Sequence, residues 1–218
     1  MSNKCPNCNL ANFPSVPVCA RCGGELSRTA ETQPAGRSFA AKLIRRAGVL
    51  ATVCLIGLAG FYLSLIGSAQ SLTLVQKQSV HDAITVLKAK GFDNEAFLME
   101  RLAAFRQNDN WLNASVAKEN AYAATNFPFE IVTLYPDYFT YPADDTERAA
   151  ILLHEARHLA GKDEHDAYEF VWKNRKQLGW TSAAYRDSPV WQNVRRQTRE
   201  NVPELFTCER AEASDCTE

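Results

Sequence analysis

The pattern of apolar and polar residues divides the chain into a short polar N-terminal segment, one long apolar run and a larger mixed region. Residues 47–69 contain no charged side chain, and the next charge along the chain is Lys77. A helix over 47–69 covers roughly 34 Å at about 1.5 Å per residue, enough to cross a bilayer. A buried core helix of this length ordinarily keeps a polar stripe, and a cleaved signal peptide lies nearer the N-terminus. We therefore expect a single transmembrane helix at 47–69.

The region after this run, 70–218, shows helical and extended patterns in turn. A strand is predicted at 129–135, where β-branched and aromatic residues precede Pro136. Because helices outnumber strands, we expect an α+β domain with a helix-rich core. The helices are predicted from apolar spacing and capping residues to run from Ser79 to Gly91, from Asp93 to about Gln107, from 144–147 to Gly161, from Asp163 to Leu178, and from Ser188-Pro189 to the residue before Pro203.

Four cysteines in the N-terminal segment, residues 1–27, have the spacing of a zinc site. Cys5 and Cys8 form one Cys-x-x-Cys pair, Cys19 and Cys22 form a second, and Gly23 permits a tight turn after it. Two such pairs make a tetrahedral four-cysteine site, and a segment this short needs the metal in order to fold. The pairs resemble those of a zinc ribbon with one structural zinc ion, in a module that is either purely structural or binds a cytoplasmic protein partner. The next residues, 28–46, predict a flexible basic linker.

Charge and cysteine usage predict which side of the membrane each part occupies. Lys and Arg outnumber Asp and Glu before the apolar run, whereas acidic residues are in excess after it. Lys42, Arg45 and Arg46 lie just before the run, so the positive-inside tendency places the N-terminus in the cytoplasm and exports the C-terminal domain. The acidic balance of that domain argues against nucleic-acid binding. Cys208 and Cys216 could close a disulfide in the periplasm or another extracytoplasmic space.

The strongest functional pattern is His154-Glu155-x-x-His158, within the predicted helix that ends at Gly161. Residues four apart lie on one face of an α-helix, so the two imidazoles can bind a single zinc ion. Glu155 stands beside them and can take a proton from a zinc-activated water and return it to a leaving amine. Arg157 points away from this face and is expected to be a surface charge. The expected chemistry is hydrolysis of a peptide or protein substrate at a catalytic zinc ion.

A catalytic zinc ion needs a third protein ligand and an open position for water. Gly161 lets the chain turn back after the motif, so a residue in the first turn of the next helix can approach the ion. Glu164 is the first choice. His165 is the alternative ligand, or a side chain that holds Glu164. Asp166 and Glu169 are expected on the helix surface.

The motif and the residues after it resemble the zincin metallopeptidases. In the metzincin branch the second histidine is followed by x-x-Gly-x-x and the third ligand, which is similar to His158, Gly161 and Glu164. In the gluzincin branch the third ligand begins Glu-x-x-Ala-Asp, which is similar to residues 164–168. The resemblance implies a zincin-like α+β domain at 70–218, and a strand beside the site, here 129–135, that pairs with extended substrate. Tyr168 is either a hydrogen-bond donor to the oxyanion or a core residue.

Together with the apolar run, these residues predict a membrane-anchored zinc metallopeptidase. Two other functions fit the same sequence. The protein could be a non-catalytic sensor or scaffold whose zinc ribbon binds a cytoplasmic protein, with a closed structural zinc site outside in which His165 joins Glu164. The exported domain could also act on cell-wall material, since zinc amidases use similar ligands.

Overall fold

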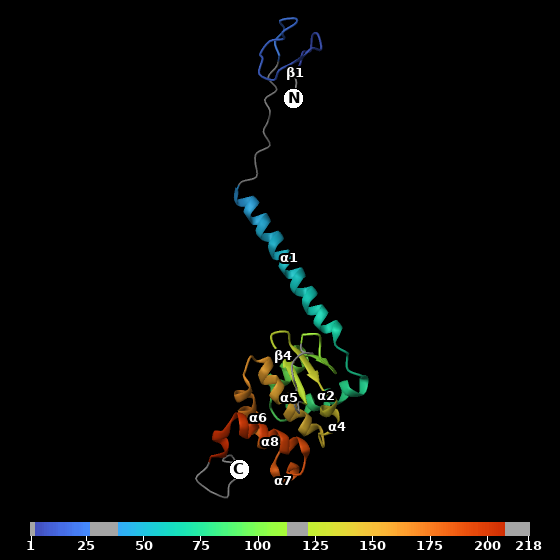
Figure 1. The fold of residues 1–218 in the computed structure, drawn as a ribbon, viewed down its shortest axis with the longest axis vertical. Helices are drawn as coiled ribbons and strands as arrows, with labels where there is room; N and C mark the ends of the chain where they lie inside the picture. The colour runs from blue at the N-terminus through green and yellow to red at the C-terminus, as the bar shows by residue number, and fades with distance from the viewer. Residues whose placement is uncertain (1–2, 27–38, 113–121, 208–218) are drawn as a thin grey trace. The chain divides into compact units, whose positions relative to one another are not determined.

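The computed structural model describes residues 3–26, 39–112 and 122–207 (Figure 1). Contacts divide the chain into two compact units, Met1–Leu55 and Ile56–Glu218. A long apolar helix, α1 at Phe39–Ser68, has residues in both units. The predicted disulfide partners Cys208 and Cys216 lie outside the described residues.

The N-terminal unit contains two similar turns, one at each of its two Cys-x-x-Cys pairs. Asn9 and Gly23 donate their backbone N–H groups to the carbonyls of Cys5 and Cys19. Both turns need left-handed backbone, with φ of 58° at Asn9 and 69° at Gly23, which asparagine and glycine tolerate best. The unit opens with a two-stranded antiparallel hairpin, β1 at Asn3–Lys4 and β2 at Ala11–Asn12.

Helix α1 is long and apolar enough to cross a membrane, and only 6% of its most apolar 18-residue stretch is buried inside the protein. A core helix would be mostly buried, so this low burial argues against that interpretation. The helix contains the predicted span up to Ser68 but begins earlier, at Phe39. The flexible linker predicted at 28–46 is therefore wrong for 39–46, where Ala, Leu, Lys and Arg favour helix. Residues 27–38 lie outside the described ranges.

The C-terminal unit combines a small mixed sheet with a larger set of helices, as the α+β prediction requires. The strands follow the order β3-β5-β4, with β5 parallel to β3 and antiparallel to β4. The strands are β3 at Ala104–Arg106, β4 at Ala123–Asn126 and β5 at Ile131–Leu134. The helices are α2 at Leu74–Ala89, α3 at Asp93–Arg101, α4 at Pro136–Thr140, α5 at Asp145–Leu159, α6 at Glu164–Leu178, α7 at Ser182–Tyr185, α8 at Pro189–Asn201 and a 3-10 turn at Pro203–Phe206.

Helix α5 is the centre of the C-terminal unit. It packs against α2, α3, α6 and β4, and Figure 1 shows it between its neighbouring helices and the sheet. Consecutive residues Ala149–Leu153 are all buried, which means that the helix is covered on every side. Glu147 and Glu155 are its buried charged residues, 0% and 4% exposed. Buried carboxylates need partners, and each of these two has them.

Capping residues fix where α5 begins. Asp144 accepts hydrogen bonds from the backbone N–H groups of Thr146 and Glu147, as predicted for an N-cap. The reciprocal bond differs from that of a capping box, because the Glu147 carboxylate accepts the N–H of Ala143 and not that of Asp144. Glu147 is turned into the core instead of lying along the helix end.

Two predicted helix boundaries are wrong. Helix α2 begins after Thr73, which exchanges side-chain and backbone hydrogen bonds with Gln76 in a capping box. Ser79, the predicted N-cap, lies inside this helix and donates its hydroxyl to a carbonyl one turn earlier. Helix α3 ends at Arg101 and not near Gln107, because the residues after it pair with β5 as strand β3. A strand pairing with residues far along the chain overrides the local helical pattern.

Candidate metal centre

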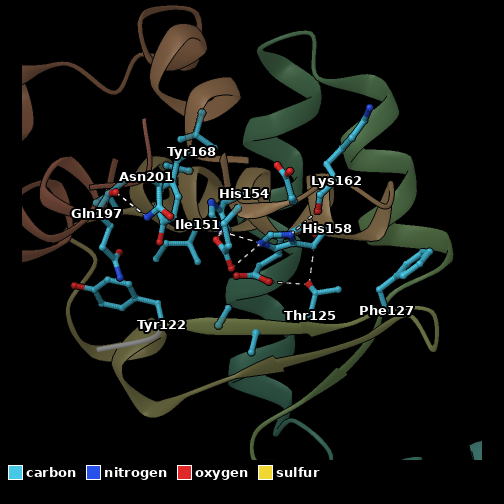
Figure 2. Close-up of a pocket in the computed structure, with 18 of the residues that line it drawn as sticks. Tyr122, Thr125, Phe127, Ile151, His154, His158, Lys162, Tyr168, Gln197 and Asn201 are labelled. Atoms are coloured by element: carbon cyan, nitrogen blue, oxygen red, sulfur yellow. Dashed lines mark hydrogen bonds and ion pairs between the residues drawn. The ribbon is translucent and has the colours of Figure 1, made fainter. Parts of the chain in front are cut away.

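The two histidines of the sequence motif lie on one face of α5 and point to the same place (Figure 2). His154 Nε2 and His158 Nε2 are 3.0 Å apart, as expected for side chains four residues apart on a helix. Their side chains are 14% and 17% exposed. The rings are therefore held by packing, yet their Nε2 atoms remain at the edge of a cleft.

Glu164 completes a group of three donors. Its carboxylate oxygens lie 3.2 Å from His154 Nε2 and 3.4 Å from His158 Nε2. The chain reaches this position by a sharp turn at Gly161, whose φ of 74° would strain any side chain. Asp163 then caps α6 by accepting a backbone N–H from its first turn. The turn and the cap together bring a carboxylate from α6 to the two imidazoles on α5, as the sequence predicts.

Two of the three donors, Glu164 and His158, have pKa values shifted from the ordinary ones. Hydrogen bonds with His154 and His158 hold the pKa of the Glu164 carboxyl well below its ordinary value. Burial lowers the pKa of His158, but the hydrogen bonds with Glu164 and with the Lys162 carbonyl outweigh burial and raise this pKa to about 9. A carboxylate that stays ionised between two imidazoles is a suitable donor for a divalent cation.

Neighbouring groups fix the orientation of both rings. His158 Nδ1 lies 2.9 Å from the carbonyl oxygen of Lys162. With the Nδ1 proton donated to that carbonyl, loss of the Nε2 proton leaves a lone pair directed at the shared point. The Tyr168 ring packs on His154, with centroids 4.4 Å apart. Burial raises the pKa of Tyr168 well above its ordinary value, so its hydroxyl keeps its proton at neutral pH.

Glu155 lies beside the donors and is held by the sheet. Thr125 Oγ1, on β4, donates a 2.7 Å hydrogen bond to Glu155 Oε2. The same hydroxyl lies 3.4 Å from the backbone carbonyl of Glu155. Thr125 was not predicted from sequence, because Ala-Ala-Thr-Asn has weak strand propensity and its partner is distant along the chain.

The three donors line a cleft of about 700 Å³. Residues Ala123–Asn126 of β4 all line one wall. Successive side chains of a strand point to opposite faces, so consecutive residues line a cleft only when the edge of the strand borders it. Figure 2 shows Tyr122 and Phe127 toward opposite ends of this wall, on either side of the two histidines. The opposite wall comes from α6 and α8, with Tyr168, Val171, Val194, Gln197 and Asn201.

The strand that borders the cleft is not the predicted one. Residues 129–135 were expected to lie beside substrate, but they contain β5, the middle strand of the sheet. Both edges of β5 are paired, with β3 and with β4, so it cannot accept another strand. The edge strand β4 occupies the place expected for 129–135.

Two further residues near the motif differ from their predicted roles. The alternative ligand His165 lies apart from the donors, with Nε2 2.8 Å from Glu204 Oε1. Arg157 is not a surface charge: its side chain is 18% exposed and stacks over the Phe170 ring, 4.2 Å from the centroid. Its Nε and Nη2 donate to Asp166 Oδ1 at 3.0 and 2.7 Å. Arg157 and Asp166 therefore fasten α5 to α6 on the side away from the donors.

The N-terminal unit holds a second group of donors. The sulfur atoms of Cys5, Cys8, Cys19 and Cys22 lie within 4.8 Å of one another. The pairs Cys5–Cys22 and Cys8–Cys19 are each 3.5 Å apart. Hydrogen bonds from the backbone of Arg21 and Cys22 lower the pKa of Cys19 to about 6, which favours the thiolate that metals bind. The four cysteines form a cluster that could bind a metal, as predicted.

The described cysteines carry no disulfide, and the small unit has little apolar core. Cys5, Cys8, Cys19, Cys22 and Cys54 are free thiols, and Cys54 is exposed on α1. Apart from two of these cysteines, the buried apolar core of this unit within the described residues is one leucine, at position 26. So small a core needs another source of stability, and a metal bound by the four thiolates would supply it.

Comparisons with protein-family models, with characterised proteins and with solved structures found no match to this chain.

Proposed function

We propose that this protein is a membrane-anchored zinc metallopeptidase with a zincin-like catalytic domain. One observation carries the proposal. His154, His158 and Glu164 converge on one point in a cleft, and the buried Glu155 carboxylate borders the same cleft. Two imidazoles, an ionised carboxylate and a neighbouring base are the groups that hydrolysis at a zinc ion requires.

The separations of the three donors fit a single zinc ion. Bonds of about 2.0–2.1 Å in a tetrahedral arrangement place two donor atoms roughly 3.4 Å apart. The observed separations among His154, His158 and Glu164 are 3.0, 3.2 and 3.4 Å. When bound there, zinc supplies a Lewis acid that polarises a carbonyl and lowers the pKa of a coordinated water. Glu164 is 60% exposed on its side chain, so the donor group is open to the cleft.

The chain itself supplies the proton acceptor. Glu155 would take the proton of the attacking water and return it to the leaving amine. Its hydrogen bond to Thr125 fixes one carboxylate oxygen and leaves the other for the proton. Tyr168 lines the cleft and keeps its hydroxyl proton, so it is our candidate donor to the oxyanion.

The edge of β4 supports a peptide substrate. A strand at the edge of a sheet has unpaired backbone N–H and C=O groups, which an extended peptide can pair with. The cleft lies along this edge and continues past the donors in both directions. We infer that substrate backbone pairs with Ala123–Asn126, which brings one of its peptide bonds over the three donors. Pairing with backbone favours polypeptide over other amides, including those of cell-wall material.

The sensor or scaffold alternative requires a closed site with four protein ligands. In that alternative His165 joins Glu164, but His165 pairs with Glu204 instead. Within the described residues, the donor group has three members and borders a cleft. An open fourth position favours hydrolysis over a purely structural zinc site.

The N-terminal unit supports a separate, structural role for zinc. Zinc–sulfur bonds of about 2.3 Å in a tetrahedron place two sulfurs roughly 3.8 Å apart, close to the 3.5 Å of both cysteine pairs. Phe13 and Val18 of this unit are 79% and 49% exposed. An exposed aromatic side chain on so small a unit is suited to a protein contact. We propose a zinc ribbon that binds a cytoplasmic protein, with the positive residues before the apolar run holding it inside.

The proposal is tested with the purified full chain in detergent. Wild type should contain roughly two zinc ions per chain and cleave a peptide library in a chelator-sensitive reaction. Glu155→Gln should keep both zinc ions and lose about 100-fold or more in kcat. Glu169→Gln is the matched control, because Glu169 pairs with Lys173 on α6 and does not line the cleft. Wild-type turnover by Glu155→Gln, or by zinc-free protein, would refute the mechanism.

A further inference from the structure

The end of the apolar helix α1 is packed onto the C-terminal domain. The Phe61 ring contacts the rings of Trp111 and Phe129, with centroids 5.6 and 5.3 Å apart. The Trp111 indole N–H donates to Ser64 Oγ at 3.2 Å, and Leu65 is 0% exposed. These contacts fix the last turns of α1 to the domain without an intervening linker.

One arginine marks where the hydrocarbon layer must end along this helix. Arg106 Nε donates to the backbone carbonyl of Ile66 at 3.3 Å. A guanidinium group is costly inside hydrocarbon, so Ile66 must lie at or beyond the membrane surface. The charge-free part of the helix from 47 to 65 is about 28 Å long at 1.5 Å per residue, close to the roughly 30 Å of a bilayer core.

A membrane surface at the level of Ile66 places part of the domain within the membrane interface. Phe61 comes five residues before Ile66, so it lies roughly 7.5 Å deeper along a helix that runs across the bilayer. Trp111 and Phe129 contact Phe61 and must therefore lie near the same depth. Trp111 is 51% exposed although its ring is large and apolar. Tryptophan at the headgroup level is a favoured membrane anchor, because its ring is apolar and its N–H is polar.

The same segment of the domain forms one end of the cleft. Phe129 contacts α1, and Phe127, two residues earlier, lines the cleft and is 56% exposed. Two residues of extended chain span at most about 7 Å. Phe127 also lies against the turn at Gly161, where an added Cβ would be 3.7 Å from its ring. Figure 2 shows Phe127 on the same side of the site as Lys162. The cleft therefore opens, at its Phe127 end, close to the surface of the membrane.

We propose that the substrate is a polypeptide anchored in the same membrane and cleaved in the extended segment next to its anchor. This inference rests on the proposed metallopeptidase function. The edge of β4 binds the backbone of that segment, and the anchor continues from the Phe127 end into the bilayer. A site held at this level reaches peptide bonds within a few residues of the membrane, and polypeptide free in solution lacks the anchor that would bring it there.

Fluorescence tests the membrane contact without any use of activity. Of the four tryptophans, all in the described residues, Trp172, Trp180 and Trp191 are at most 3% exposed. Trp111 is then the one that lipid can reach. Full-length protein in vesicles of brominated phosphatidylcholine should lose Trp111 emission relative to vesicles of ordinary phosphatidylcholine. Trp111→Phe should abolish that difference. Equal emission in the two lipids for wild type, or quenching that persists in Trp111→Phe, would overturn the inference.

Cleavage tests the substrate class with the zinc-loaded full chain in the same vesicles. One cleavable sequence is presented as a soluble peptide and as peptides joined to a transmembrane helix, at either end, through spacers of roughly 3, 15 and 40 residues. For one of the two points of attachment, the peptide with the shortest spacer should be cleaved about tenfold faster than the peptide with the longest. Equal rates for all spacers would show that the anchor only brings substrate to the membrane, and would overturn cleavage next to the anchor. A soluble peptide cleaved as fast as the anchored ones would overturn the anchored substrate class and leave the peptidase function intact. If wild type cleaves nothing beyond Glu155→Gln, the peptidase itself fails, and the substrate class fails with it.

Discussion

Replacing Glu147 tests how helix α5, which carries the candidate metal ligands His154 and His158, is held in the core. Glu147 Oε2 accepts the Ala143 N–H at 2.8 Å and the Ser188 hydroxyl at 2.7 Å, and Oε1 accepts the Trp180 indole N–H at 3.2 Å. The side chain is 0% exposed. The donors come from the segment before α5, from the residue after Gly179 and from the N-cap of α8. Glu147 therefore joins three parts of the domain to the first turn of α5.

The structure sets the size of the effect. Each hydrogen bond to a charged acceptor contributes about 1.5 kcal/mol net, so three contribute about 4.5 kcal/mol. Truncating one member of a buried charged network ordinarily costs about 3–5 kcal/mol, and we expect that loss in the free energy of unfolding of Glu147→Ala. Glu147→Gln keeps one oxygen, which can still accept the Trp180 N–H. Its amide nitrogen then faces the Ala143 N–H, where two donors meet and no hydrogen bond forms, so we expect a loss of about 1–3 kcal/mol in the free energy of unfolding.

Urea unfolding of the detergent-solubilised full chain measures both losses. Tryptophan fluorescence reports on the core, because the Trp172, Trp180 and Trp191 rings pack together. The alanine variant should also melt roughly 10 °C lower. Asp145→Asn is the matched control: it lies on the same turn with a 41% exposed side chain, and should change stability by less than about 0.5 kcal/mol. A loss under about 1 kcal/mol for Glu147→Ala, or equal losses for alanine and glutamine, would refute this account of the network.

Three further changes separate the parts of the molecule. Thr125→Val removes the hydroxyl that holds Glu155 Oε2, so kcat should fall about tenfold, in a peptide-cleavage assay, while zinc content measured by mass spectrometry stays the same. An unchanged kcat would show that the hydroxyl does not position the base. Cys8→Ser removes one thiolate of the N-terminal cluster, so zinc content should fall from roughly two to one per chain while peptide cleavage persists. Loss of cleavage would link the two sites. Arg157→Leu leaves Asp166 without its partner between α5 and α6. Because the Asp166 side chain is 36% exposed, water partly replaces that partner, and the free energy of unfolding in urea should fall by about 1–2 kcal/mol. A free energy of unfolding equal to that of wild type would mean that this ion pair does not stabilise the packing of α5 on α6.

Features that depend on neighbouring residues were predictable from the sequence. Asp144 and Ser188 cap helices α5 and α8 as predicted, because an N-cap bonds to backbone N–H groups two or three residues ahead. Helix α6 begins next to Asp163, as predicted. Gly179 ends α6 in left-handed backbone for the same local reason. The α+β class also followed, since it needs only the relative number of helical and extended segments.

Features that depend on distant residues were not predictable. Strands β3 and β4 were missed, because Ala104–Arg106 and Ala123–Asn126 have little strand character of their own and are extended only through pairing with β5. Arg157 looked like a surface charge on a helical wheel, yet α6 covers that face and supplies Asp166 and Phe170. Burial of a helix face is decided by what packs on it.

The sequence by itself determined the donor residues of both candidate metal sites and the apolar helix. Spacing within one helix fixes His154 and His158 on one face, a glycine turn returns Glu164 to them, and four cysteines in two pairs need no distant residue. Tertiary structure alone decided what surrounds these donors. It made β4 the edge of the cleft, bonded Thr125 to Glu155, and packed Phe61 on Trp111. The reason is physical: periodicity and turns act over a few residues, whereas a cleft is formed by segments that meet only after the chain has folded.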